Sequence, residues 1–302
     1  MCSIPRMERT RAILKLDVAL VRRLLDSQFP QWADRPIRPV RPMGWDNRSF
    51  RLGDDMVVRL PSARFYAPQV EKEHRWLPIL APQLPLPIPT PIAMGQPLHG
   101  YPWPWSIYGW LPGKTLSMRQ ISGSQRLARS LGLFLRALQR ADPTGGPPPG
   151  PDNFHRGGSL RVYDTETRQA ISFLEAEIDA KAATLLWDAA LAAPHQGPPM
   201  WLHGDVSAGN LLVEGGALAG VIDFGCAAVG DPACDLALAW SSMGRRARHV
   251  FRSALHLDDS AWVRARGWAL WKALIVRAGL VPAHPAAEKQ SRVALERILS
   301  DA

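Results

Sequence analysis

The hydrophobic and polar positions of the first sixty residues predict one helix followed by two strands. Helical spacing over residues 16–27 forms one apolar face behind Asp17, whose side chain suits an N-cap. The residues of that face are Leu20, Val21, Leu24 and Leu25. Residues 43–52 and 56–61 predict a pair of strands, because the intervening Gly53-Asp54-Asp55 suits a tight turn.

Beyond residue 70 the apolar positions recur mainly at helical spacing. Residues 70–77 predict a helix that Pro78 kinks or ends, and the proline-dense stretch 81–91 predicts an extended connector. A loop rich in proline and glycine is predicted over residues 144–158. Three longer stretches keep helical spacing: residues 124–140, 165–192 and 258–279.

Residues 201–225 carry two short polar clusters separated by strand-like segments. His203-Gly204-Asp205, followed by Asn210, supplies an acid that can accept a proton from a hydroxyl and an amide oxygen that can ligate a hard cation. Asp223 ends the second apolar segment, and Glu214-Gly215-Gly216 suits a hairpin turn between the two segments. The hairpin would return Asn210 and Asp223 to one end, beside Asp205, where their oxygens would suit Mg²⁺.

The order H-x-D-x-x-x-x-N and then D-F-G resembles the catalytic signature of the protein kinase fold. With Gly204 inside the first cluster and the sequel Gly230–Ala237, the chain is similar to the aminoglycoside phosphotransferase family. The resemblance covers most of the chain and implies an α+β, two-lobed protein-kinase-like fold. It implies a small β-rich nucleotide-binding lobe over residues 1–108 and a larger, mainly helical catalytic and substrate-binding lobe over residues 109–302.

The resemblance also implies roles for individual residues. Asp205 would orient and deprotonate the acceptor hydroxyl, and Asn210 with Asp223 would hold Mg²⁺ against the nucleotide phosphates. Arg59 stands where the family has a phosphate-gripping lysine, and its planar fork keeps the positive charge with a different geometry. Glu73 matches the glutamate that pairs with this cation, and Glu71 is a close competitor.

Two further segments are implied to bind the nucleotide. The loop near Gly44 has one glycine where the family has several, so Asn47 and Ser49 would help to supply donors to phosphate. By the alignment on Leu111-Pro112-Gly113, Tyr108 and Trp110 are the candidates for contacting the base. Asp231 and Asp235 are interpreted as structural, with Asp235 capping a helix or bracing the catalytic loop.

Composition narrows the class of protein and its partners. The chain has 302 residues, of which 46% are hydrophobic, which is enough for a packed core. A net charge of +9 could attract nucleic acid weakly, but no recognised binding motif accompanies it, so we expect no nucleic-acid partner. The same charge mildly disfavours a polycationic acceptor. Charged residues between Arg6 and Arg11 do not suit a secretory signal, and no apolar stretch is long enough to span a membrane. Three cysteines without metal-site spacing favour the cytoplasm.

The sequence therefore predicts a Mg²⁺-dependent phosphotransferase that moves the γ-phosphoryl group of ATP or GTP to a hydroxyl of a small molecule. The acceptor would lie near residues 144–192 and 258–279, and it could be an aminoglycoside, a macrolide, another antibiotic or a metabolite such as an amino alcohol or a sugar. Antibiotic resistance and metabolism are both open as roles. The alternative is a nucleotide-binding pseudokinase or regulatory protein without turnover, which Arg59 and the sparse glycines favour.

Overall fold

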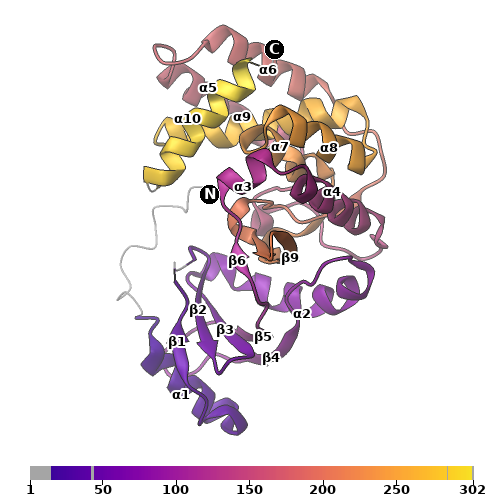
Figure 1. Cartoon of the computed structure of the whole chain (residues 1–302). Helices are drawn as coiled ribbons and strands as arrows, with labels where there is room; N and C mark the ends of the chain where they lie inside the picture. The colour runs from indigo at the N-terminus through magenta and orange to yellow at the C-terminus, as the bar shows by residue number, and fades with distance from the viewer. Residues whose placement is uncertain (1–14, 42–43, 284, 301–302) are drawn as a thin grey trace. The chain divides into compact units, whose positions relative to one another are not determined.

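A computed structural model describes residues 15–41, 44–283 and 285–300 of the chain (Figure 1). Cys2 and the charged segment between Arg6 and Arg11 lie outside this part. The described residues form two compact units, one made of residues 15–113 with 220–225 and the other of residues 114–219 with 226–300. The first unit therefore includes the D-F-G segment, which a single division after residue 108 would assign to the second lobe.

The first unit is built on a five-stranded antiparallel sheet with the strand order β1-β2-β3-β5-β4. Its strands are β1 (Ile37–Pro39), β2 (Asn47–Leu52), β3 (Met56–Pro61), β4 (Pro91–Gly95) and β5 (Trp105–Gly109). The two strands predicted within residues 43–61 are confirmed as β2 and β3. Gly53, with a φ of +61°, begins the tight turn that joins them.

Strand alternation gives this sheet one apolar and one polar face. On the apolar face, residues such as Phe50, Val58 and Ile107 pack in one core with the buried residues of α1 (Val18–Gln28). The predicted N-cap is confirmed, because the Asp17 side chain accepts from Leu20 N at 2.9 Å. On the other face, the register pairs Arg59 with Ser49 of one neighbouring strand and with Ser106 of the other.

The helix predicted over residues 70–77 is α2 (Pro68–Leu80), and it continues through Pro78 to Leu80. Pro78 lacks the N–H that would donate to the His74 carbonyl, but it lies in the last turn, so only two residues of the helix follow the lost bond. Glu73, Leu77 and Leu80 are buried, whereas Glu71 is exposed.

The second unit is mainly helical (Figure 1). Its described helices are α3 (Met118–Gly123), α4 (Gln125–Arg140), α5 (Asp164–Phe173), α6 (Ala180–Ala192), α7 (Ala237–Ser241), α8 (Arg245–Leu255), α9 (Asp259–Arg277) and α10 (Pro285–Ser300). The helices predicted over residues 124–140 and 258–279 are confirmed as α4 and α9, and Asp258 caps α9 by accepting from Ala261 N at 2.7 Å. No helix in the described part of the chain is long and apolar enough to cross a membrane.

The prediction of one helix over residues 165–192 is wrong, because the structure divides it into α5 and α6. The side chain of Asp179 accepts from Ala182 N at 2.9 Å and so caps the start of α6. An aspartate that bonds to the backbone in this way competes with a continuous helix.

Two small sheets lie mainly in the second unit, and one of them leads into the D-F-G segment. One has the order β6-β8-β9 and the other pairs β10 with β7. Their strands are β6 (Lys114–Thr115), β7 (Met200–Leu202), β8 (Leu211–Glu214), β9 (Ala217–Val221) and β10 (Ala228–Gly230). The predicted hairpin is confirmed as β8 and β9, with Gly215 and Gly216 at positive φ in its turn.

The core of the second unit is centred on α9, which is buried along most of its length. The rings of Trp268 and Trp271 lie 5.7 Å apart, edge to face. Tyr163, just before α5, stacks on Trp271 at 4.0 Å, and the indole N–H of Trp271 donates to Glu166 at 2.8 Å. This aromatic cluster fixes α9 against α5.

Candidate active site

The His-Gly-Asp loop is held by a buried carboxylate. Asp235, 1% exposed, accepts the backbone N–H of His203 at 2.7 Å with one oxygen and that of Gly204 at 2.7 Å with the other. Burial raises the pKa of Asp235, although the two backbone N–H groups that donate to it oppose the rise. Asp235 therefore braces the His-Gly-Asp loop, as predicted.

Gly204 allows this loop to make its turn. Its φ is +82°, and a Cβ at this position would lie 2.3 Å from the carbonyl oxygen of Cys226. The fully buried His203 accepts the N–H of Asp205 through Nδ1 at 3.2 Å, so its proton lies on Nε2. These contacts fix the backbone from which the Asp205 side chain extends.

The carboxylate of Asp205 has two partners, and 36% of the side chain is exposed, which leaves room for a ligand. Lys272 of α9 donates to Oδ1 at 3.0 Å, and the Asn210 amide donates to Oδ2 at 3.1 Å and to the Asp205 carbonyl at 2.9 Å. Burial alone would raise the pKa of Asp205, but the charges of Lys272 and Arg156 hold it well below its usual range. Asp205 is thus ionised and oriented.

Lys272 and Arg156 were not predicted as site residues. Lys272 follows a tryptophan within an apolar helix, and Arg156 lies in a segment whose proline and glycine content indicates only a loop. Neither position matches the family signature. The one available signal was their place within the stretches 144–192 and 258–279 predicted to bind the acceptor.

In the first unit, the structure brings Arg59 together with two of the predicted acids. Its guanidinium donates to Asp223 Oδ1 at 2.7 Å and to Glu73 Oε2 at 3.4 Å. Burial would lower the pKa of Arg59, but the charges of Glu73 and Asp223 raise it above its ordinary value. Glu73 rather than the exposed Glu71 is therefore the partner of this cation.

The other predicted nucleotide residues surround this ion pair in the sheet. Ser49 lies opposite Arg59, and Asn47 belongs to the same strand two residues earlier. Tyr108 is 1% exposed and its hydroxyl donates to Glu73, while burial raises the pKa of that hydroxyl well above its ordinary value. The guanidinium carbon of Arg51 lies 3.9 Å from the ring centre of Trp110. The backbone N–H of Trp110 donates to the Asp55 carbonyl at 2.7 Å.

Helix α2 also holds the D-F-G segment, which belongs to the same unit. The ammonium of Lys72 donates to the Gly225 carbonyl. A Cβ at Gly225 would lie 2.4 Å from the side-chain oxygen of Gln69, which explains glycine at this position. Asp223 has a φ of +70°, so this segment is held in a conformation that side chains rarely adopt.

Asn210 and Asp223 have the oxygen atoms that are expected as ligands of Mg²⁺. The amide nitrogen of Asn210 donates to Asp205. The amide oxygen of Asn210 has no hydrogen-bond partner among the described residues. One oxygen of Asp223 accepts from Arg59, while the other is unpaired within the same described part. An amide and a carboxylate oxygen suit a hard cation. The two residues belong to different units, so their meeting at one metal stays a prediction.

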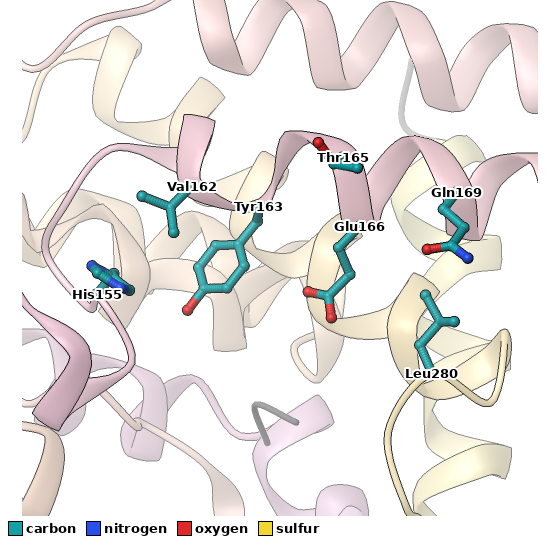
Figure 2. Close-up of a pocket in the computed structure, with 7 residues that line it drawn as sticks. All are labelled: His155, Val162, Tyr163, Thr165, Glu166, Gln169 and Leu280. Atoms are coloured by element: carbon teal, nitrogen blue, oxygen red, sulfur yellow. The ribbon is translucent and has the colours of Figure 1, made fainter. Parts of the chain in front are cut away.

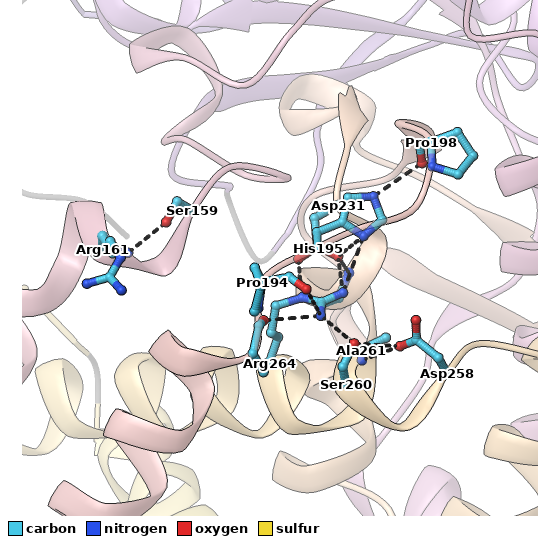
Figure 3. Close-up of polar contacts among 12 residues, drawn as sticks. Ser159, Arg161, Pro194, His195, Pro198, Asp231, Asp258, Ser260, Ala261 and Arg264 are labelled. Atoms are coloured by element: carbon cyan, nitrogen blue, oxygen red, sulfur yellow. Dashed lines mark hydrogen bonds and ion pairs between the residues drawn. The ribbon is translucent and has the colours of Figure 1, made fainter.

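Asp231 has a structural role, as predicted. It forms two hydrogen bonds with the guanidinium of Arg264, at 2.7 Å to Nε and 3.1 Å to Nη2, and both residues are buried. Figure 3 shows Arg264 between Asp231, His195 and the carbonyl of Pro194. This ion pair fixes the first turns of α9 against the segment that follows β10, and the bonds of Arg264 to the carbonyls of Ala193 and Pro194 fix them against the segment that precedes β7.

A cavity of about 500 Å³ opens in the second unit. Figure 2 shows its lining residues, which are His155, Val162, Tyr163, Thr165, Glu166, Gln169 and Leu280. Six of these seven lie within residues 144–192, one of the two stretches predicted to bind the acceptor. The cavity has one carboxylate, that of Glu166, which already accepts from Trp271.

The sequence matches the model of the phosphotransferase enzyme family over residues 37–271. No curated protein sequence matches the chain significantly. Among solved structures, the GDP complex of wild-type aminoglycoside 2'-phosphotransferase-IIIa is 18% identical, with a TM-score of 0.70 over 94% of this chain and 98% of that chain. The GDP and kanamycin complex of APH(2")-IIIa is 19% identical, with a TM-score of 0.69 over 93% and 99% of the two chains.

A macrolide enzyme has the same fold. The apoenzyme of macrolide 2'-phosphotransferase MphH from Brachybacterium faecium is 23% identical, with a TM-score of 0.57 over 90% of this chain and 97% of that chain. The predicted α+β, protein-kinase-like fold is confirmed by these likenesses.

Proposed function

Because the chain belongs to the phosphotransferase enzyme family, we propose that it transfers the γ-phosphoryl group of ATP or GTP to a hydroxyl group of a small molecule. The observation that carries this proposal is the geometry of Asp205. Its carboxylate is ionised, partly exposed and held in one orientation by Lys272 and Asn210. An oriented carboxylate on a rigid loop is what a phosphoryl acceptor needs for alignment.

The reaction depends on the positioning of the acceptor hydroxyl against the γ-phosphorus more than on a strong base. The acceptor oxygen forms a bond to the γ-phosphorus while the bond from that phosphorus to the bridging oxygen breaks, which leaves ADP or GDP. Asp205 accepts a hydrogen bond from the hydroxyl and takes its proton as the new bond forms. Since the Lys272 charge lowers the basicity of Asp205, its main contribution is orientation, and the proton passes on to solvent.

Charge on the phosphates is the second requirement. Arg59 lies on the polar face of the sheet beside Ser49, where its guanidinium can bind phosphate oxygens. Asn210 and Asp223 would hold Mg²⁺, which supplies neutralisation of the negative charge on the nucleotide phosphates when it is bound. Asn47 and Ser49 would add hydrogen-bond donors to the phosphates.

The base would bind beside the end of β5. The hydroxyl of Tyr108 already donates to Glu73, and the backbone N–H of Trp110 already donates to the Asp55 carbonyl. Backbone recognition by Trp110 would therefore use its carbonyl oxygen. We place the reaction in the cytoplasm, because the three cysteines of the sequence, an odd number, do not suggest a disulfide framework.

One observation favours the second candidate, a nucleotide-binding protein without turnover. Arg59 bonds directly to Asp223, and a guanidinium on this carboxylate competes with a metal ion for its oxygens. A pseudokinase would keep this pair when nucleotide is bound. A catalyst would exchange it for contacts to the phosphates and to Mg²⁺.

The test is transfer of phosphate by the purified protein with Mg²⁺ and ATP or GTP, across aminoglycosides, macrolides and small hydroxylated metabolites, with the product detected by mass. Asp205→Ala should bind nucleotide with unchanged affinity and lose transfer by about 10²- to 10⁴-fold. Retained transfer by this variant would exclude the role of Asp205. Tight nucleotide binding without transfer to any acceptor would favour the pseudokinase.

A further inference from the structure

Arg156 is a buried cation whose charge acts on Asp205 without any hydrogen bond or ion pair to a carboxylate among the described residues. The residue is 6% exposed, and its Nε is fully enclosed without a hydrogen-bond partner. Its guanidinium carbon lies 4.8 Å from the ring centre of Trp271 and 5.2 Å from that of Trp268. Within the described part of the chain, no carboxylate or carbonyl oxygen forms a hydrogen bond or ion pair with this guanidinium. Its ring contacts there are with these two indoles, and its charge also interacts with Tyr163 and Asp205.

This arrangement is costly unless something pairs with the charge. An arginine keeps its proton in proteins, and a buried charge needs a partner to offset its desolvation. The contrast with Arg264 of the same unit is direct, because that guanidinium bonds to a carboxylate and to two backbone carbonyls. Aromatic rings stabilise a guanidinium only modestly. The guanidinium N–H groups of Arg156 that have no hydrogen-bond partner among the described residues therefore suit an anionic group from outside the chain.

The position of Arg156 beside the catalytic loop is built by hydrogen bonds. Asn153 donates to the carbonyl of Arg156 at 3.0 Å and to that of Cys226 at 3.4 Å, and the Cys226 carbonyl is the atom packed against Gly204. Arg156 is close enough to Asp205 for its charge to act on that carboxylate. A group bound at Arg156 would thus lie near the acceptor hydroxyl.

Two further features continue this site. Lys272, 43% exposed, adds a second positive charge directly on Asp205. His155, the neighbour of Arg156, lines the cavity of about 500 Å³ together with Tyr163 (Figure 2). Tyr163 stacks on the Trp271 ring that contacts Arg156. Arg156 and Lys272 carry two positive charges against the one negative charge of Asp205, and this excess would repel an ammonium group and attract a carboxylate or a phosphate.

We propose that Arg156 and Lys272 form an anion subsite of the acceptor site, so that the acceptor carries a carboxylate or phosphate group close to the hydroxyl that it presents to Asp205. That the bound anion is the phosphoryl acceptor rests on the proposed function. The binding of an anion by Arg156 and Lys272 does not depend on it. It predicts that this chain prefers a hydroxylated acid to a polycationic molecule.

The experiment uses a series of four small probes that differ in charge. They are 3-amino-1,2-propanediol, glycerol, glycerate and glycerol 3-phosphate. Their binding to the full-length protein with Mg²⁺ and ADP or GDP is measured by thermal shift, and their phosphorylation with ATP or GTP is measured by mass. The wild type should bind glycerate and glycerol 3-phosphate at least about tenfold more tightly than the amine and glycerol, as charge-assisted hydrogen bonds imply.

The variants assign the preference to residues. Arg156→Met should abolish the preference for the anionic probes and Arg156→Lys should keep part of it. Lys272→Met, at a partly exposed position, should weaken it and serves if Arg156→Met does not fold. Arg161→Met is the matched control, because Arg161 is exposed in the same segment and should leave the preference unchanged.

Three results would overturn the subsite. One is equal binding of all four probes by the wild type, and another is preferred phosphorylation of the amine or of kanamycin that Arg156→Met leaves unchanged. The third is a loss of nucleotide affinity in Arg156→Met with anion preference intact, which would assign Arg156 to the nucleotide phosphates. An Arg156-dependent preference without phosphorylation of any probe supports the subsite and counts against the proposed function instead.

Discussion

Arg59 donates to Asp223 at 2.7 Å across 164 positions of the sequence. The same guanidinium donates to Glu73 at 3.4 Å, so one side chain joins β3, α2 and the D-F-G segment within a single unit. A lysine, with one ammonium on a flexible stem, lacks the planar fork that spans two carboxylates. Arginine at this position therefore has a geometric reason, which the sequence alone did not reveal.

Arg59→Lys should weaken both the unit and its nucleotide site. The ammonium can pair with Glu73 or with Asp223, and the loss of one charge-assisted hydrogen bond should reduce nucleotide affinity by about tenfold, or about 1.4 kcal/mol. Isothermal titration with Mg²⁺ and ATP or GTP measures this change. Unchanged or tighter binding by Arg59→Lys would contradict the bridging role.

Glu73→Gln should lower the free energy of unfolding by about 2 kcal/mol, because it removes the charge from a buried hydrogen bond to Arg59. Urea unfolding measures the loss. Glu71→Gln is the matched control from the same helix, and the exposed position of Glu71 should limit its effect to less than about 0.5 kcal/mol. Equal effects of the two variants would mean that the Glu73 contact contributes nothing specific.

Lys272→Met should move the acid limb of the pH–rate profile to higher pH. The Lys272 charge helps to hold the pKa of Asp205 well below its usual range, so wild-type Asp205 stays ionised as pH falls through the ordinary range of carboxyl pKa values. Without this charge the pKa rises, and Asp205 is protonated earlier on acidification. The profile of kcat/KM between pH 4 and 8 measures the shift, and coinciding acid limbs would refute the electrostatic role of Lys272.

The residues around the catalytic loop show what could be predicted from sequence. The signature predicts Asp205, Asn210 and Asp223 as site residues from local spacing, and the family pattern predicts the pair of Arg59 with Glu73, whose contact is present in the structure. Periodicity identified α1, α4 and α9 because each has a continuous apolar face and a capping side chain. An apolar face and a capping side chain are encoded within the segment itself, so they can be predicted without knowledge of the tertiary structure.

Arg156 and Lys272 could not be predicted, because their importance comes from contacts made by distant segments. Arg156 meets α9 through Trp268 and Trp271, more than a hundred positions away, and no spacing rule joins them. The division of residues 165–192 was missed for a related reason. Asp179 can be a surface residue of a helix or the cap of a new one, and tertiary packing decides which.

Gly204→Ala should abolish activity and destabilise the second unit. A methyl group there meets the Cys226 carbonyl at 2.3 Å, in a loop already fixed by Asp235. Gly216→Ala separates the cost of backbone conformation from that of the clash, since Gly216 has a similar φ of +78° and its Cβ would meet nothing within 4 Å. Thermal unfolding and transfer rates compare the two. Similar losses would show that conformation alone explains the glycine at 204.

Asp235→Asn tests whether the brace acts on catalysis through the loop. Asparagine has nearly the same size, but one of its two polar atoms is a donor and opposes a backbone N–H of His203 or Gly204. Leaving one buried donor unpaired should lower the free energy of unfolding by about 1 to 3 kcal/mol. The displaced Asp205 should reduce kcat more than it raises the KM for nucleotide, because the nucleotide residues of the first unit are unchanged. Steady-state kinetics with urea unfolding separates these effects, and a stability loss with unchanged kcat would mean that Asp235 supports only the fold.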